Sequence, residues 1–249
     1  MYEPRTYRHW IKDKDLTSFN IVVKETDLYI RASTNLGEKA YELVLKYRHE
    51  LESYIRHHPD FVTSLEPLPV SDDAPHIIIE MSAAAAKVGV GPMASVAGAI
   101  AEFAGNELLG FSPEIIIENG GDIYLKSLEK RIVGIYAGKS PLTGKIGLEI
   151  NGQDTPLGIC TSSGTVGHSL SYGKADAVVV LSRSATLADA AATAIGNLIV
   201  QPGDIPNGLE FANGIDGLKG VIIINGDKVG LWGDVKICQL PLVNNLYVA

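Results

Sequence analysis

Asp189 and Thr193 stand four positions apart in an alanine-rich stretch of the chain. On a helix, this spacing places a carboxylate and a hydroxyl on one face. Both are hard oxygen donors, which Mg²⁺ accepts when substrate phosphates complete its octahedron. The pair therefore predicts a metal-assisted site for a ligand that carries a diphosphate. The alternative is structural, because Thr186 and Asp189 have the spacing of a capping box that would hold the first turn of the helix.

Two glycine-containing segments would let a ligand approach the backbone closely. Gly89 to Ser95 leads into an expected helix N-terminus, where free amides attract anions. Glu118 to Asp122 holds a glycine pair after an apolar strand, which either makes room for a flat ligand or bends the sheet. A helix-to-helix turn also explains the first segment, and a β-hairpin turn also explains the second. The sequence leaves these alternatives open.

A third segment, from Cys160 to His168, concentrates a thiol, several hydroxyls and one imidazole in nine positions. The residues around Ser162 lack the G-x-S-x-G pattern, which argues against a serine hydrolase. His168 is the first candidate for a general base. Cys160 is either a reactive thiol or a small apolar filler of a buried strand.

Three segments together resemble the ApbE-like superfamily, whose best-known members are FAD:protein FMN transferases. Residues 177–194 resemble its C-terminal metal motif, while Glu118 to Asp122 and Gly91 to Gly98 resemble two flavin-site motifs. The resemblance implies Mg²⁺ held by Asp189 and Thr193, with FAD or FMN as the bound nucleotide. It implies a small-molecule cleft lined by Gly91, Met93, Ala94, Ser95, Asn119, Gly120, Gly121, Asp122, Ser162, Ser163 and Gly164.

The chain departs from the superfamily pattern at three places. Ser95 stands where the family has a lysine, Ala101 where it has an acidic residue, and a loop beginning at His168 replaces its His-x-x-Asp-Pro-Arg-Thr-Gly loop. Three functions are therefore expected. One is a protein that binds a flavin nucleotide with Mg²⁺, either as an FMN transferase or as a degenerate form of one, with His168 as its catalytic residue. The second is a role in sulfur assimilation, with Cys160 or Cys238 as the reactive thiol. A short branch of the superfamily is associated with sulfur assimilation. The third is a non-catalytic binding module.

Composition excludes several other classes. The 249 residues are 46% apolar and 20% charged, which is typical of a globular protein. The net charge of −8 and the scattered basic residues argue against a nucleic-acid partner. Residues 81–101 carry one charge but are interrupted by two glycines and a proline, so no membrane span is expected. Two separated cysteines and an N-terminus without a signal-peptide pattern favour a cytoplasmic protein. A homodimer is the default assembly.

Hydrophobic periodicity predicts an α+β fold of antiparallel sheets backed by helices. A hairpin is expected over 19–32, with its turn at 25–27, and a proline-rich linker over 66–75. The resemblance implies a T-fold-like architecture with two similar halves, about 1–110 and 111–249, in a single domain over 1–249. The predicted helices cover 35–58, 76–88, 93–109, 186–200 and 207–212. The predicted strands that follow cover 114–118, 122–125, 131–136, 145–150, 157–160, 175–181, 221–224 and 229–232.

Overall fold

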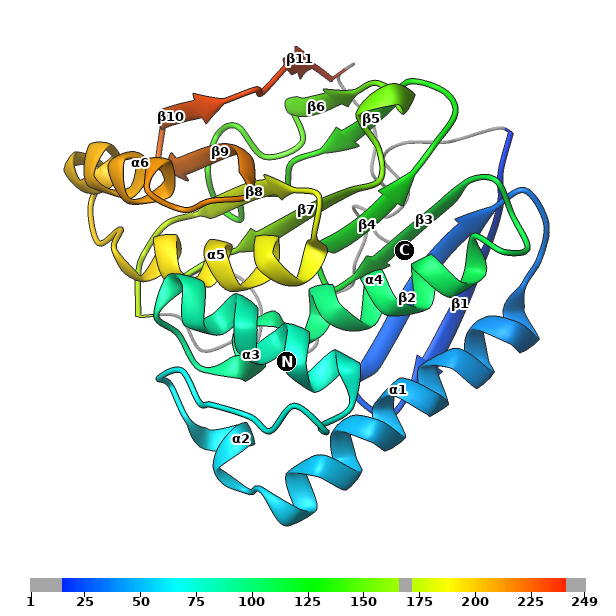
Figure 1. The fold of residues 1–249 in the computed structure, drawn as a ribbon. Coiled ribbons are helices and arrows are strands. Elements are labelled where there is room, and N and C mark those ends of the chain that lie inside the picture. The colour runs from blue at the N-terminus through cyan, green and yellow to red at the C-terminus, as the bar shows by residue number, and fades with distance from the viewer. Residues whose placement is uncertain (1–14, 166–171, 241–249) are drawn as a thin grey trace.

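An eight-stranded antiparallel sheet forms the framework of the protein, whose computed structural model describes residues 15–165 and 172–240 (Figure 1). The strand order is β1-β2-β3-β4-β7-β8-β9-β10, so strands from both ends of the chain lie in one sheet. The strands are β1 (Thr17–Val23), β2 (Thr26–Ala32), β3 (Ile115–Asn119), β4 (Asp122–Lys126), β7 (Leu157–Ser162), β8 (Ala177–Ser182), β9 (Leu218–Asn225) and β10 (Lys228–Gly233).

Helices cover one face of this sheet, and a smaller sheet covers part of the other (Figure 1). The smaller sheet has the order β11-β6-β5. Its strands are β5 (Arg131–Gly134), β6 (Ile146–Ile150) and β11 (Ile237–Gln239). The helices are α1 (Gly37–His57), α2 (Asp60–Thr63), α3 (His76–Val88), α4 (Val96–Leu108), α5 (Ala185–Asn197) and α6 (Ile205–Asn213), with a 3₁₀ turn η2 (Pro92–Ser95) before α4.

Two apolar cores follow from the alternation of side chains along the central strands. Val178 and Val180 of β8 point into the core under the helices, whereas Val179 and Leu181 point into the core under the small sheet. Because these strands are covered on both faces, they read as continuous apolar runs and not as an alternating pattern. The predicted α+β class with antiparallel sheets and backing helices is confirmed.

The predicted elements differ from the structure mainly in how they associate. The predicted strands at 131–136 and 145–150 pair in the second sheet, which the sequence pattern did not separate from the first. Strand β11 and the short helix α2 were not predicted. The first hairpin turns at Lys24, one residue earlier than expected, with a positive φ of 52° there. The predicted linker is the connection between α2 and α3, and its Val70 packs against the helix-side core.

No single helix in the described ranges is long and apolar enough to cross a membrane. Two successive segments, His76–Val88 and Pro92–Leu108, meet the length and composition criteria only as a pair bent by 103°.

Gly158 lets the start of α5 lie directly on β7. A Cβ atom at this position would lie 2.3 Å from the Ala185 Cα, which is backbone and cannot turn away. We expect Gly158→Ala to lower the free energy of unfolding by about 1–3 kcal/mol through overpacking. Urea denaturation followed by circular dichroism measures this change.

Gly203→Ala is the matched control, because a Cβ there would meet no atom within 4 Å. It should leave the free energy of unfolding unchanged or slightly increased. Equal effects of the two substitutions would contradict the close contact between β7 and α5.

Candidate functional site

The site is built where α4 crosses α5. The Gly98 N–H donates a 2.8 Å hydrogen bond to the Asp189 Oδ2, although the two residues are 91 positions apart. A Cβ at Gly98 would lie 2.3 Å from the Ala185 carbonyl oxygen and 2.8 Å from the Asp189 Cβ. Glycine is therefore what allows the two helices to approach closely enough for this bond.

A second carboxylate, Glu102 of α4, bridges the two helices in the other direction, because it accepts hydrogen bonds from residues at the start of α5. The Glu102 Oε2 of α4 accepts hydrogen bonds from the Thr186 backbone N–H at 2.9 Å and from the Thr186 Oγ1 at 2.8 Å. It also accepts one from the Ser184 Oγ at 3.0 Å. Each helix thus supplies a carboxylate to free amides in the first turn of the other, where negative charge is favoured.

The alternative interpretation of Thr186 and Asp189 as a capping box of α5 is wrong. Ser184 is the N-cap of α5, and its hydroxyl accepts a hydrogen bond from the Leu187 N–H. Asp189 does cap free helix amides, but they belong to α4. The Thr186 hydroxyl is bound to Glu102 and takes no part in a cap of its own helix.

Two further titratable side chains, Asp122 and Cys160, project from the sheet toward this contact. The Asp122 Oδ1 accepts a 3.2 Å hydrogen bond from the Thr161 N–H. The Cys160 thiol donates to the Ala185 carbonyl oxygen at 3.3 Å. Both residues are buried, with 8% of Asp122 and none of Cys160 exposed.

Burial changes the acid–base behaviour of all three groups. Desolvation raises the pKa of Asp189 to about 7, and the amides of Gly98 and Ala97 oppose part of that shift. Desolvation also raises the pKa of Asp122 well above its ordinary value, and the charge of Asp189 raises it further. The pKa of the Cys160 thiol is raised by burial and by both carboxylates. The pair of carboxylates therefore favours a proton or an added cation.

Thr193 lies one turn beyond Asp189 on α5, as the sequence spacing predicts. Both side chains are half-buried, and the Thr193 hydroxyl has no hydrogen-bond partner within the described ranges. Among the described residues, no three His, Cys, Asp or Glu side chains are arranged to hold a metal ion. A cation bound by Asp189 and Thr193 would therefore take its remaining oxygen ligands from a bound molecule, the backbone or water.

The glycine pair after β3 forms a two-residue hairpin turn. Gly120 and Gly121 have positive φ angles of 70° and 111°, which favour glycine, and Asn119 pairs with Asp122. The Asn119 Nδ2 donates a 3.1 Å hydrogen bond to the Ala97 carbonyl oxygen. The turn therefore lies against the first turn of α4, beside the amides that bind Asp189.

The segment from Gly91 to Ser95 is used largely for packing. A Cβ at Gly91 would lie 1.9 Å from the Ser64 carbonyl oxygen, so this glycine faces the end of α2. Ser95 is fully buried, and its hydroxyl donates to the Pro92 carbonyl oxygen at 2.8 Å. Met93 and Ala94 are half-buried on the 3₁₀ turn before α4.

The end of β7 approaches the same helix α5 near its C-terminal turn. A Cβ at Gly196 would lie 3.4 Å from the Ser162 Oγ, so Ser162 is beside the turn that follows Thr193. The Ser163 Oγ accepts a 3.1 Å hydrogen bond from the Thr165 N–H, and Gly164 is exposed. His168 lies outside the described residues, and its catalytic role stays a prediction.

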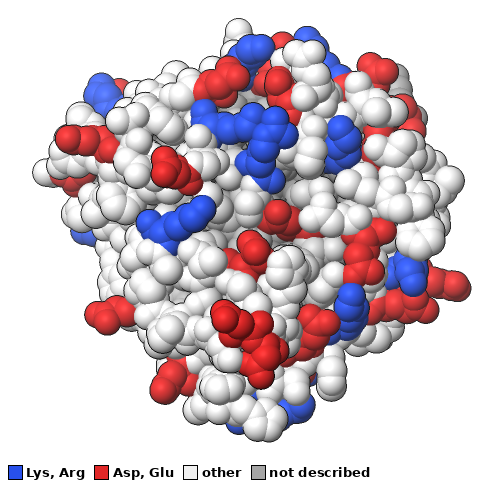
Figure 2. Space-filling view, in the orientation of Figure 1, with Lys and Arg blue, Asp and Glu red and all other residues white. Residues whose placement is uncertain are grey.

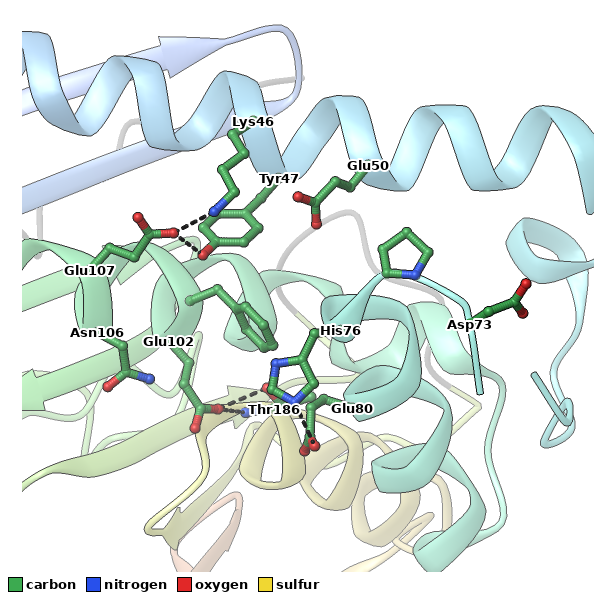
Figure 3. Close-up of a pocket in the computed structure, with 12 residues that line it drawn as sticks. Lys46, Tyr47, Glu50, Asp73, His76, Glu80, Glu102, Asn106, Glu107 and Thr186 are labelled. Atoms are coloured by element: carbon green, nitrogen blue, oxygen red, sulfur yellow. Dashed lines mark hydrogen bonds and ion pairs between the residues drawn. The ribbon is translucent and has the colours of Figure 1, made fainter. Parts of the chain in front are cut away.

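A separate cavity of about 900 Å³, which the sequence did not predict, lies between α1, α3, α4 and the start of α5 (Figure 3). Among the residues discussed for the site from sequence, only Thr186 lines it. Glu102 also lines it, and its spacing of four from Gly98 places it one turn along α4. That spacing was the one signal in the sequence that could have linked Glu102 to the contact between the helices.

The fold and the comparisons with known proteins place the chain in the ApbE-like superfamily. A family model described as AbpE bacteria matches residues 8–207, and the chain belongs to that family. It is 45% identical over 221 residues to a UPF0280 protein of Methanocaldococcus jannaschii, covering 86% of this chain and 90% of that one. It is 42% identical over 227 residues to a UPF0280 protein of Methanocella arvoryzae, covering 91% and 90%.

Solved structures show the same fold at low sequence identity. The apo form of the flavinyl transferase ApbE from Pseudomonas stutzeri matches with a TM-score of 0.55 and 14% identity, covering 87% of this chain and 93% of that chain. The ApbE protein of Thermotoga maritima matches with a TM-score of 0.55 and 14% identity, covering 86% and 96%.

The raised pKa of Asp189 predicts a pH-dependent stability in the absence of divalent cations. Because the folded carboxyl holds its proton up to about pH 7 and the unfolded one releases it near pH 4, the free energy of unfolding should fall as pH rises through that window. One such proton contributes a slope of at most about 1.4 kcal/mol per pH unit. Asp189→Asn should flatten the slope, measured by urea denaturation between pH 4 and 8.

Asp204→Asn is the control of opposite sign. Backbone amides lower the pKa of Asp204, so this carboxylate stabilises the fold above pH 4 and loses that effect as pH falls. The variant should be less stable at neutral pH and keep the decline between pH 4 and 7. If the free energy of unfolding of the wild-type protein rises between pH 4 and 7, the raised pKa of Asp189 is contradicted.

Proposed function

We propose that this protein binds a flavin nucleotide, or a related molecule with a diphosphate, together with Mg²⁺ at Asp189 and Thr193. The observation that carries the proposal is the pair of carboxylates, the buried Asp122 and the half-buried Asp189, beside the Thr193 hydroxyl, which has no hydrogen-bond partner among the described residues. Desolvation raises the pKa of both carboxyl groups, and the charge of Asp189 raises that of Asp122 further, so added positive charge is stabilising at this site. The Thr193 hydroxyl adds a neutral oxygen donor of the type that Mg²⁺ accepts.

The surroundings of Asp189 suit the charged end of a nucleotide. The hairpin at Asn119 to Asp122 and the first turn of α4 meet here, and Gly120 is exposed without a side chain to block approach. Backbone amides at a helix start favour anionic groups. A Mg²⁺ ion, when bound, supplies charge that neutralises a diphosphate and stabilises a leaving phosphate. The flavinyl transferase activity in the name of the Pseudomonas relative supports a flavin as the first nucleotide to test.

Transfer of FMN is the finer form of this proposal. It requires that the residues around the diphosphate hold it in line with an acceptor and that a base takes the acceptor's proton. His168 is the proposed base, and Asp122 and Asp189 are the proposed positioning groups. Because the His168 loop departs from the family's motif, binding without transfer is the second form of the same proposal.

A sulfur-carrier role for Cys160 is not supported by its surroundings. A carrier needs an accessible thiol with a lowered pKa. Cys160 is fully buried, its thiol is bonded to the Ala185 carbonyl oxygen, and its pKa is raised. Cys238 is half-buried on β11 and stays the thiol to test for this alternative.

Calorimetric titration with FAD, FMN and ADP, each with and without Mg²⁺, tests the proposal. We expect wild-type binding to depend on Mg²⁺ and Asp189→Asn to weaken it about 10- to 100-fold, because a charged oxygen ligand is lost. Asp227→Asn, on an exposed turn, is the matched control and should bind as wild type does. Equal affinity of wild type and Asp189→Asn for every nucleotide would overturn the metal site.

Thr193 offers a finer test because its hydroxyl can be removed without changing its shape. Thr193→Val should weaken Mg²⁺-dependent binding about 10-fold, whereas Thr193→Ser, which keeps the oxygen, should restore most of it. The same calorimetric titration measures both variants. If valine and serine bind alike, the hydroxyl is not a ligand.

A further inference from the structure

The cavity of about 900 Å³ between α1, α3, α4 and the start of α5 lies apart from the nucleotide site proposed above. Its volume is in the range of small-molecule sites in proteins. Figure 3 shows that side chains from α1, α3 and α4 converge on it, including Tyr47, His76 and Glu102. Figure 2 shows acidic side chains around the middle of the face in view, with basic side chains above them.

Aromatic rings form the centre of the cavity. Phe103 lies between Tyr47 and His76, with ring centroids 5.3 Å away in each case and edge-to-face angles of 74° and 62°. Such rings bind hydrocarbon chains and attract cations to their faces. An inorganic ion would make no apolar contact with these rings, so the rings indicate an organic ligand.

The charges around the rings are mostly negative and incompletely paired. The cavity is lined by five carboxylates, one ammonium group and one imidazole; these are Glu50, Asp73, Glu80, Glu102, Glu107, Lys46 and His76. The His76 Nε2 lies 3.4 Å from the Glu80 Oε1, a contact that a bound ammonium group would replace. The Lys46 Nζ is already 2.7 Å from the Glu107 Oε1, which also accepts a hydrogen bond from the Tyr47 hydroxyl. Glu50 is half-buried and has no side-chain partner among the described residues. The cavity lining therefore has more carboxylates than positively charged groups to pair with them.

We propose that this cavity binds a linear organic cation with two or more ammonium groups. Its ammonium groups would pair with Glu50 and Glu80, and its methylene chain would lie against Phe103. An anion is disfavoured because the only lysine is paired and the amide of Thr186 is occupied by Glu102. A bare metal ion is disfavoured because no three described carboxylate, histidine or cysteine side chains are placed to hold one.

Calorimetric titration with spermidine at low ionic strength tests this inference. We expect saturable binding to wild type that weakens as salt is added, since the carboxylates are partly exposed. The double variant with Glu50→Gln and Glu80→Gln should bind about 5-fold more weakly or worse. Glu210→Gln, on the exposed side of α6, is the matched control and should change the affinity by less than about twofold.

Two further arms separate an organic cation from general attraction of counterions. Phe103→Leu should weaken spermidine binding about 3-fold, because it keeps apolar volume but removes the ring face. MgCl₂ should displace spermidine no better than NaCl of the same ionic strength. Equal spermidine binding by wild type and the double variant, or stronger displacement by MgCl₂, would overturn the inference.

The outcome does not depend on the proposed nucleotide site. Asp189→Asn should bind spermidine as wild type does, because Asp189 does not line the cavity. Loss of nucleotide binding with spermidine binding kept, or the reverse, would show which of the two proposals had failed. Spermidine binding that is abolished by Asp189→Asn in a folded protein would contradict the placement of the cavity site.

Discussion

The close crossing of α4 and α5 is the constraint on which the rest of the site depends. At Gly98 the helices are so near that no side chain fits between them. The gain from this approach is that Asp189 reaches an amide of α4 while Glu102 reaches an amide of α5. A cap of this kind is worth about 1 kcal/mol. The exchange of carboxylates therefore fixes both the spacing of the helices and their register.

The fixed register explains how one carboxylate can serve both the fold and a ligand. The Asp189 Oδ2 accepts a hydrogen bond from the Gly98 amide, and the Asp189 charge raises the pKa of Asp122. The other carboxylate oxygen of Asp189 and the Thr193 hydroxyl lie on the same face of α5. In the absence of a cation, desolvation raises the pKa of both carboxyl groups, so ionising them in the folded protein costs stability. Such local costs are typical of functional sites, where a site is organised for a partner that the fold alone does not supply.

The sequence predicts the elements well but not their long-range partners. Apolar residues recur with a clear period along the helices and strands, so the bounds of these elements were predicted within a few residues. The glycine pair after β3 determines its hairpin turn locally, which was one of the two interpretations that the sequence left open. Assignment of β5 and β6 to a second sheet failed because alternation along a strand does not identify its neighbour. The partner of Asp189 was mistaken for the same reason, since Gly98 is 91 residues away. The common position of Asp189 and Thr193 could be predicted because residues four apart on a helix lie on the same face.

The proposed nucleotide site and the acidic cavity are joined through the contact between α4 and α5. Glu102 and Thr186, which line the cavity, lie one turn along α4 and α5 from Gly98 and Asp189. A substitution that moves either helix would therefore disturb both places at once. Side chains on the far walls, such as Glu50 of α1 and Glu80 of α3, can change without moving the crossing. The two proposed sites thus share the crossing of α4 and α5, whereas the residues proposed to contact each ligand are different. Variants at the cavity walls and at Asp189 therefore test the two proposals separately.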